Sequence, residues 1–142
     1  MVQNKRVIFA SIPNGYPVAG KDLVLDAQEL DLTKVPPGGV ITKNFYFSLD
    51  PYLRGRMRPA EVKSYSPAFT LGEPMSNHGI GQIAASDHPE LKEGDWVVGF
   101  LGLEGHSALK ADVAKQLKKI NNPHNLHYSY FVGVLGMPGL TA

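Results

Sequence analysis

Residues 40–56 read VITKNFYFSLDPYLRGR, and they decide the fold because an extended apolar run turns into a helix start within them. Residues 40–49 are rich in β-branched and aromatic side chains, which suit a pleated, half-buried strand. At Asp50 the pattern changes. Its carboxylate can accept hydrogen bonds from free N–H groups at a helix start, and Pro51 loses no hydrogen bond at the first helical position. We therefore predict a strand followed by a short helix over Asp50–Arg56, which carries Tyr52 and ends early because of Gly55.

Outward from this segment, glycine and proline divide the chain into short extended runs. Fifteen glycines and eleven prolines separate stretches in which apolar and polar residues mostly alternate, a pattern typical of β-strands. The predicted strands are Val7–Ser11, Leu23–Leu32, Val40–Leu49, Gly79–Ala85 and Trp96–Phe100. Loops are expected at Pro13–Gly20 and Lys63–Glu73, whereas Ser107–Val113 fits a strand or a helix. The sequence thus predicts a mainly β fold with short helices.

The pattern changes again near the last residues. Leu126, Tyr130 and Val134 recur at the spacing of one helix face, which predicts a helix that ends at Gly136. Pro138 then stands where a second helix could start, four residues before Ala142. Because so short a helix is not stable alone, we expect the sequence to be part of a longer protein.

Composition excludes several classes of function. The 142 residues suit one domain, and their net charge of +1 comes from scattered residues, which argues against a nucleic-acid or anionic-membrane surface. Arg54, Arg56 and Arg58 are expected on a solvated or locally paired face. The absence of cysteine excludes a disulfide framework, a thiolate zinc site and a cysteine nucleophile. No leader or long apolar run is visible, so we expect a soluble, cytoplasmic protein.

Few residues carry readable chemistry. His124 and His127 are three apart but have no matching carboxylate, so polar residues near a helix start are favoured over metal ligands. No Gly-x-Ser-x-Gly elbow occurs, and the glycine spacings match no phosphate-binding loop. Tyr52 is the stronger candidate, because a phenol at a strand end can line a cleft and offer a hydrogen bond. A packing role for Tyr52 is the alternative.

Three motifs carry a family resemblance. Residues 45–57 (FYFSLDPYLRGRM) and residues 133–142 (GVLGMPGLTA) resemble segments of the NADP-dependent alkenal double-bond reductases, a group that includes the prostaglandin reductases. Residues 92–99 (KEGDWVVG) are similar to a turn and strand of the wider medium-chain dehydrogenase/reductase superfamily. The three motifs stand in the family's order and span nearly the whole chain.

The resemblance implies a fold and a site. It implies a GroES-like, partly open β-barrel over residues 1–136, the start of a linking helix at 137–142, and a Rossmann domain beyond. It further implies that NADPH gives a hydride to the C=C bond of an α,β-unsaturated aldehyde or ketone, and that the parent protein is a homodimer. Tyr52 would contact the substrate, while Pro51, Tyr52, Met137 and Thr141 would border the cofactor. No catalytic residue is assigned within these residues, so the chain alone is expected to be inactive.

Departures from the family's zinc-dependent members also matter. Those members place a cysteine before the short helix and a Gly-His-Glu further on, whereas this chain lacks cysteine and reads PMSNHG at residues 74–79. We therefore expect no zinc. An alternative interpretation is a non-catalytic binding or interaction module with the same GroES-like fold.

Overall fold

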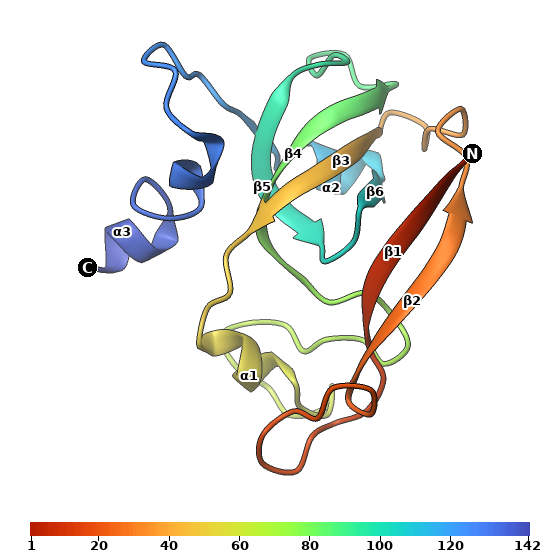
Figure 1. The fold of residues 1–142 in the computed structure, drawn as a ribbon, viewed down its shortest axis with the longest axis vertical. Coiled ribbons are helices and arrows are strands. Elements are labelled where there is room, and N and C mark those ends of the chain that lie inside the picture. Colours follow the sequence, from red (N-terminus) through yellow and green to blue (C-terminus); the bar gives the residue numbers. More distant parts are fainter.

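Two antiparallel sheets form the body of the protein in a computed structural model that describes residues 1–142 (Figure 1). A two-stranded hairpin pairs β1 (Val2–Phe9) with β2 (Leu23–Leu30). The second sheet has the strand order β6-β3-β4-β5-β7. Its strands are β3 (Val40–Phe47), β4 (Ser76–Ser86), β5 (Trp96–Gly102), β6 (His106–Leu109) and β7 (Lys118–Lys119).

The helices are all short. They are α1 (Tyr52–Arg56), α2 (Ala111–Ala114), the 3-10 turn η1 (Tyr128–Phe131) and α3 (Met137–Thr141). None of them combines the length and the apolar composition that crossing a membrane requires. In Figure 1, η1 and α3 lie apart from the hairpin, on the far side of the five-stranded sheet.

Two apolar clusters hold these parts together. The larger cluster packs against the curved five-stranded sheet. It consists of Val40, Ile83, Leu91, Val97, Leu101, Ala114 and Leu117. The β3–β4 pairing shifts register twice, between Ile41 and Thr42 and between Asn44 and Tyr46, and such bulges bend a sheet toward a barrel. The smaller cluster of Phe9, Met57, Phe69 and Met75 joins the hairpin to the segment around α1.

The strand predictions are confirmed with shifted boundaries. Each expected strand is present, although β1 begins at Val2 and β4 at Ser76, earlier than the alternation indicated. The ambiguous stretch 107–113 contains both structures, because β6 ends at Leu109 and α2 begins at Ala111. Residues 63–73 form no helix or strand, as expected for a loop.

The predicted helix over Leu126–Leu135 is wrong. Only η1 forms there, and Val134 is 67% exposed. The apolar spacing marks no buried face, because Leu126 and Tyr130 are exposed as well; the segment packs instead through Tyr128, whose ring stacks on Trp96 with centroids 4.0 Å apart, and through buried Val132. The chain then turns, because the N–H of Gly136 donates to the carbonyl of Gly133. The predicted second helix near Pro138 is present as α3.

The three clustered arginines bind backbone carbonyls. Arg54 donates to the carbonyl of Gly15 at 2.8 Å, and Arg58 donates to that of Val62 at 2.7 Å. Arg56 is only 5% exposed and donates to the carbonyls of Pro67 and Ser76. A solvated position is therefore wrong for Arg56, because its buried guanidinium pairs with one carbonyl in the 63–73 loop and one at the start of β4.

Candidate functional site

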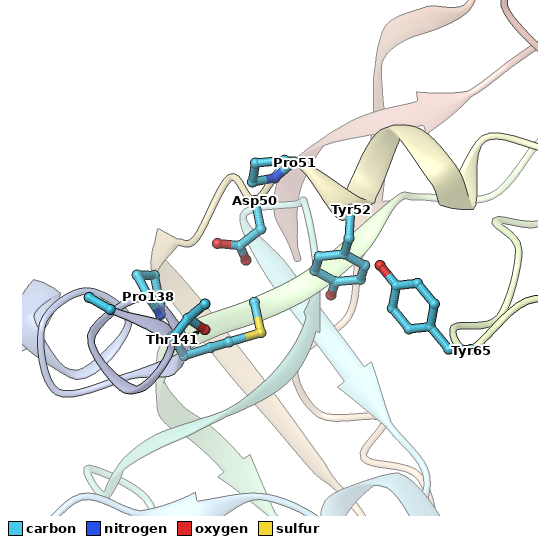
Figure 2. A pocket seen from close by; sticks show the side chains of 8 residues that line it. Asp50, Pro51, Tyr52, Tyr65, Pro138 and Thr141 are labelled. Carbon is cyan, nitrogen blue, oxygen red and sulfur yellow. Dashed lines mark hydrogen bonds between the residues drawn. The ribbon is translucent and has the colours of Figure 1, made fainter.

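A pocket of about 620 Å³ lies where the start of α1 faces α3. Its walls are formed by Asp50, Pro51, Tyr52, Tyr65, Met137, Pro138, Thr141 and Ala142. All four residues singled out in the sequence, Pro51, Tyr52, Met137 and Thr141, are among them. Figure 2 shows Pro51 and Tyr52 on one side of the pocket and Pro138 and Thr141 across it. The structure thus brings together residues from two segments far apart in the chain, while their roles stay predictions.

The α1 side of the pocket is formed where the chain leaves β3 and turns into a helix at Pro51. Pro51 has φ −57° and ψ −32°, which is already helical geometry. The N–H of Leu53 donates to the carbonyl of Asp50 at 3.1 Å and closes the first turn. This turn places the Tyr52 ring against the pocket, where it is half-buried.

The expected cap by the Asp50 side chain is absent, and that expectation is wrong. No side chain caps α1. The carboxylate of Asp50 instead accepts from Ser48 Oγ at 2.7 Å and from Asn77 Nδ2 at 2.7 Å. Because these donors lie on the sheet side, they draw the carboxylate away from the helix N–H groups, and it borders the pocket (Figure 2).

The opposite wall depends on a close backbone approach. A Cβ atom added to Gly139 would lie 1.7 Å from the carbonyl oxygen of Val134, so only glycine lets α3 fold back onto the preceding turn. Within α3, Thr141 Oγ1 donates to the carbonyl of Met137 at 2.8 Å. Met137 and Thr141 are thereby held on the side of α3 that faces Tyr52.

The Tyr52 phenol belongs to a buried hydrogen-bond network. Its hydroxyl donates to Oδ1 of Asn77, a residue with no exposed surface. Burial raises the pKa of Tyr52 above its usual value, although the nearby Arg56 guanidinium opposes the shift. The phenol is therefore protonated at neutral pH and can form hydrogen bonds without acting as a base.

Sequence reasoning missed Asn77, Tyr65 and the direction of Asp50. Asn77 is the one buried polar side chain of β4, but the sequence around it shows no clean alternation, since Ile80 and Ile83 are both buried. A polar residue at an inward position of a strand requires partners. Tyr65 gave no signal: it lies in the 63–73 loop and is 86% exposed, with its ring centroid 6.5 Å from that of Tyr52.

The histidines lie elsewhere. His127 bonds Tyr46 through Nε2 at 3.3 Å and Ser129 through Nδ1 at 2.7 Å, so both ring nitrogens have protein partners. No three side chains among His, Cys, Asp and Glu converge closely enough to hold a metal ion. His106 begins β6 and is half-buried, and burial lowers its pKa.

Comparison with protein families gives one match that spans most of the chain. Residues 5–120 match the family described as the N-terminal domain of oxidoreductase. The chain is also 46% identical, over its whole length, to an NADP-dependent oxidoreductase of Cochliobolus heterostrophus, of which it covers 41%. It is 38% identical to an NADP-dependent 2-alkenal reductase of Nicotiana tabacum, matching over 99% of this chain and 40% of that protein. The chain thus spans about two fifths of the length of these relatives.

Solved structures agree with the sequence matches. CurA from Vibrio vulnificus, in complex with NADPH, superposes with a TM-score of 0.75 at 30% identity, covering 96% of this chain and 38% of CurA. The expected mainly β, GroES-like barrel with short helices is therefore confirmed.

Proposed function

Because the chain belongs to the NADP-dependent medium-chain reductases, whose N-terminal domain it forms, we propose that it is the substrate-side domain of an enzyme that reduces the C=C bond of α,β-unsaturated aldehydes or ketones. The observation that carries the proposal is the pocket itself. It brings Pro51 and Tyr52 of the short helix opposite Met137 and Thr141. In this proposal residues 1–136 are the barrel and residues 137–142 begin the helix that links it to a cofactor-binding domain.

The pocket suits the nicotinamide end of NADPH. Pro51, Met137 and Pro138 give it apolar walls, and Tyr52 adds a flat ring with one hydroxyl, a combination typical of sites for small aromatic groups. The chain contains no glycine-rich phosphate loop, so the phosphates would be bound by residues outside it. Bound NADPH would supply the hydride that reaches the carbon β to the carbonyl.

The chain's own residues have three tasks in this reaction. Met137 and Pro138 exclude water from the pocket, which strengthens the electrostatic interactions inside it. The Tyr52 ring contacts the substrate, while its hydroxyl orients the nicotinamide ring beside it. Hydride addition builds negative charge on the carbonyl oxygen, which requires hydrogen-bond donors there, and we propose that these come from outside residues 1–142.

Zinc, compartment and assembly belong to the same proposal. The chain has no cysteine, and no three metal-ligating side chains converge, so we propose hydride transfer without zinc. A cysteine-free sequence is compatible with the reducing cytoplasm, where we place the protein. The family resemblance is the reason for proposing a homodimer.

The test is a reductase assay of the full-length protein that contains this domain. We expect loss of NADPH absorbance with alkenals and alkenones, and no activity from residues 1–142 alone. The Tyr52→Phe variant should lower kcat/KM by about tenfold, because one oriented hydrogen bond is lost while the ring stays. Absence of NADPH oxidation across a panel of enals and enones would reject the proposal and favour the non-catalytic binding module.

A further inference from the structure

The orientation of the buried Asn77 amide is fixed by two acceptors. Its Nδ2 lies 2.6 Å from the carbonyl oxygen of Ser48 and 2.7 Å from Oδ2 of Asp50. A carbonyl and a carboxylate can only accept hydrogen bonds, so the amide nitrogen, and not the oxygen, must face them. Oδ1 of Asn77 therefore faces the Tyr52 hydroxyl.

The direction of the Tyr52 hydrogen bond follows from this orientation. An amide oxygen has no hydrogen to give, so Tyr52 must be the donor in the bond between them. Turning the Tyr52 hydrogen toward the pocket would leave Oδ1 of Asn77 without a donor at a site that has no exposed surface, which is costly. The Tyr52 oxygen therefore offers only lone pairs, to the nearby Arg56 guanidinium and to a ligand in the pocket.

Two other polar side chains of the pocket behave in the same way. The Thr141 hydroxyl gives its hydrogen to the carbonyl of Met137 at 2.8 Å, so its oxygen also faces outward as an acceptor. The Asp50 carboxylate accepts one bond on each oxygen and keeps further lone pairs. Only the exposed Tyr65 hydroxyl is free to turn either way.

We propose that Asn77 is a positioning residue, which holds the hydroxyl hydrogen of Tyr52 in a bond that points away from the pocket. The pocket then binds a ligand group that donates hydrogen bonds, such as a carboxamide or a hydroxyl, in preference to a carbonyl group that can only accept them. The inference rests on the proposed function in taking this pocket as the ligand site. It specifies which part of the ligand the pocket binds, because the carboxamide of a nicotinamide ring is such a donor. The substrate carbonyl must then accept its hydrogen bonds from residues on another wall.

The test compares two probes that differ in one donor group. Nicotinamide carries an N–H donor, whereas methyl nicotinate has the same ring and carbonyl without one. Binding of each is measured with the NADPH-free full-length protein that contains this domain, from ¹H–¹⁵N shifts of Tyr52, Met137 and Thr141. We expect nicotinamide to bind about fivefold more tightly, the value of one ordinary hydrogen bond.

Two variants separate the cause. In Asn77→Ala the Tyr52 hydroxyl is free to turn, so methyl nicotinate should gain affinity and the ratio should approach one. In Tyr52→Phe nicotinamide should lose affinity while methyl nicotinate stays unchanged. Should Asn77→Ala fail to fold, the wild-type ratio and Tyr52→Phe still decide the question.

Equal binding of the two probes to the wild type, tighter binding of the ester, or no shift at these residues with nicotinamide would overturn the inference. Because the test uses no reductase activity, its failure is distinct from a failure of the enal and enone assay. A reductase with an unselective pocket would refute the role of Asn77 alone.

Discussion

The Asn4 side chain bonds both backbone groups of His106. Nδ2 of Asn4 donates to the His106 carbonyl at 2.8 Å, and the His106 N–H donates to Oδ1 of Asn4 at 2.8 Å. Asn4 lies in β1 and is 2% exposed, whereas His106 begins β6 at the edge of the other sheet. The side-chain amide of Asn4 therefore forms the same pair of hydrogen bonds that a neighbouring strand would form, and it joins the hairpin to the barrel.

Replacing Asn4 by leucine should destabilise the protein by about 2–3 kcal/mol, because two buried backbone groups of His106 lose their partners while the side-chain volume is kept. Gln3→Leu is the matched control. Gln3 is exposed on the same strand, so its replacement should change the free energy of unfolding by less than about 0.5 kcal/mol. Urea unfolding measures both variants, and equal effects would contradict the role of the Asn4 clamp.

Glu104, which accepts from Asn4 and from Ser107, should make stability fall as the pH rises. Burial raises the pKa of Glu104 above its ordinary value of 4.5, so the folded state binds a proton that the unfolded state has released. The stability that Glu104 contributes is fully present below pH 4.5, and it is lost as the pH rises through the pKa of the folded state. In Glu104→Gln this loss should vanish.

The difference between wild type and Glu104→Gln, taken at each pH, isolates this group. Hydrogen bonds lower the pKa values of Asp22, Asp26, Asp31 and Asp95 from 3.8, so their contributions change only at more acidic pH. His106 has a lowered pKa and costs stability below pH 6.5, but it is present in both proteins and cancels. Parallel stability curves for the two proteins above pH 4.5 would refute the prediction.

The secondary structure could be predicted from the sequence where the local residue types admit only one conformation. The β-branched and aromatic residues of Val40–Phe47 form a strand whose first three residues are all buried, and Pro51 has the helical dihedral angles that begin the turn after it. The spacing of Leu126, Tyr130 and Val134 misled because all three side chains are exposed, while the segment packs through Tyr128, which stacks on Trp96. A helical period of apolar residues predicts a buried face only where a regular helix forms, and over so short a segment it can arise without one.

The site was readable in part, for a related reason. Tyr52 and Pro51 belong to a local turn, so sequence alone could single them out. The partners of Tyr52 come from β4 and from a loop, and bonds between residues far apart in the chain leave no local pattern. Asp50 shows the limit clearly, because its local role as a cap was displaced by Asn77, which lies 27 positions further along the chain.

Gly39→Ala should destabilise the protein by at least about 2 kcal/mol, because a Cβ atom there would lie 2.0 Å from the backbone oxygen of Leu109 and the backbone cannot yield cheaply. Gly55→Ala is the control. Gly55 lies inside α1 with no atom within 4 Å of an added Cβ, so alanine should stabilise by about 0.5–1 kcal/mol. Thermal unfolding that moves in the same direction for both variants would contradict this assignment.

Arg56→Lys should destabilise the protein by about 2–3 kcal/mol and loosen the 63–73 loop. The Arg56 guanidinium donates to the Pro67 carbonyl at 2.9 Å and to the Ser76 carbonyl at 2.6 Å, and it lies 4.1 Å from the centre of the Phe69 ring. A lysine ammonium is a single point charge that cannot reproduce the planar fork and the ring contact together. Since Tyr65 lies in this loop, we expect the pocket to lose that wall.

Arg54→Lys serves as the control for this prediction. Arg54 is exposed and bonds the Gly15 carbonyl at 2.8 Å, so the change should cost less than about 1 kcal/mol. Amide hydrogen exchange in residues 63–73 should accelerate in Arg56→Lys and stay unchanged in Arg54→Lys. If both variants exchange alike, the loop is held by the Phe9–Phe69 contact, whose ring centroids are 5.7 Å apart, and not by the guanidinium. Faster exchange in Arg56→Lys alone would show that the helix that carries Tyr52 also holds the neighbouring wall formed by Tyr65.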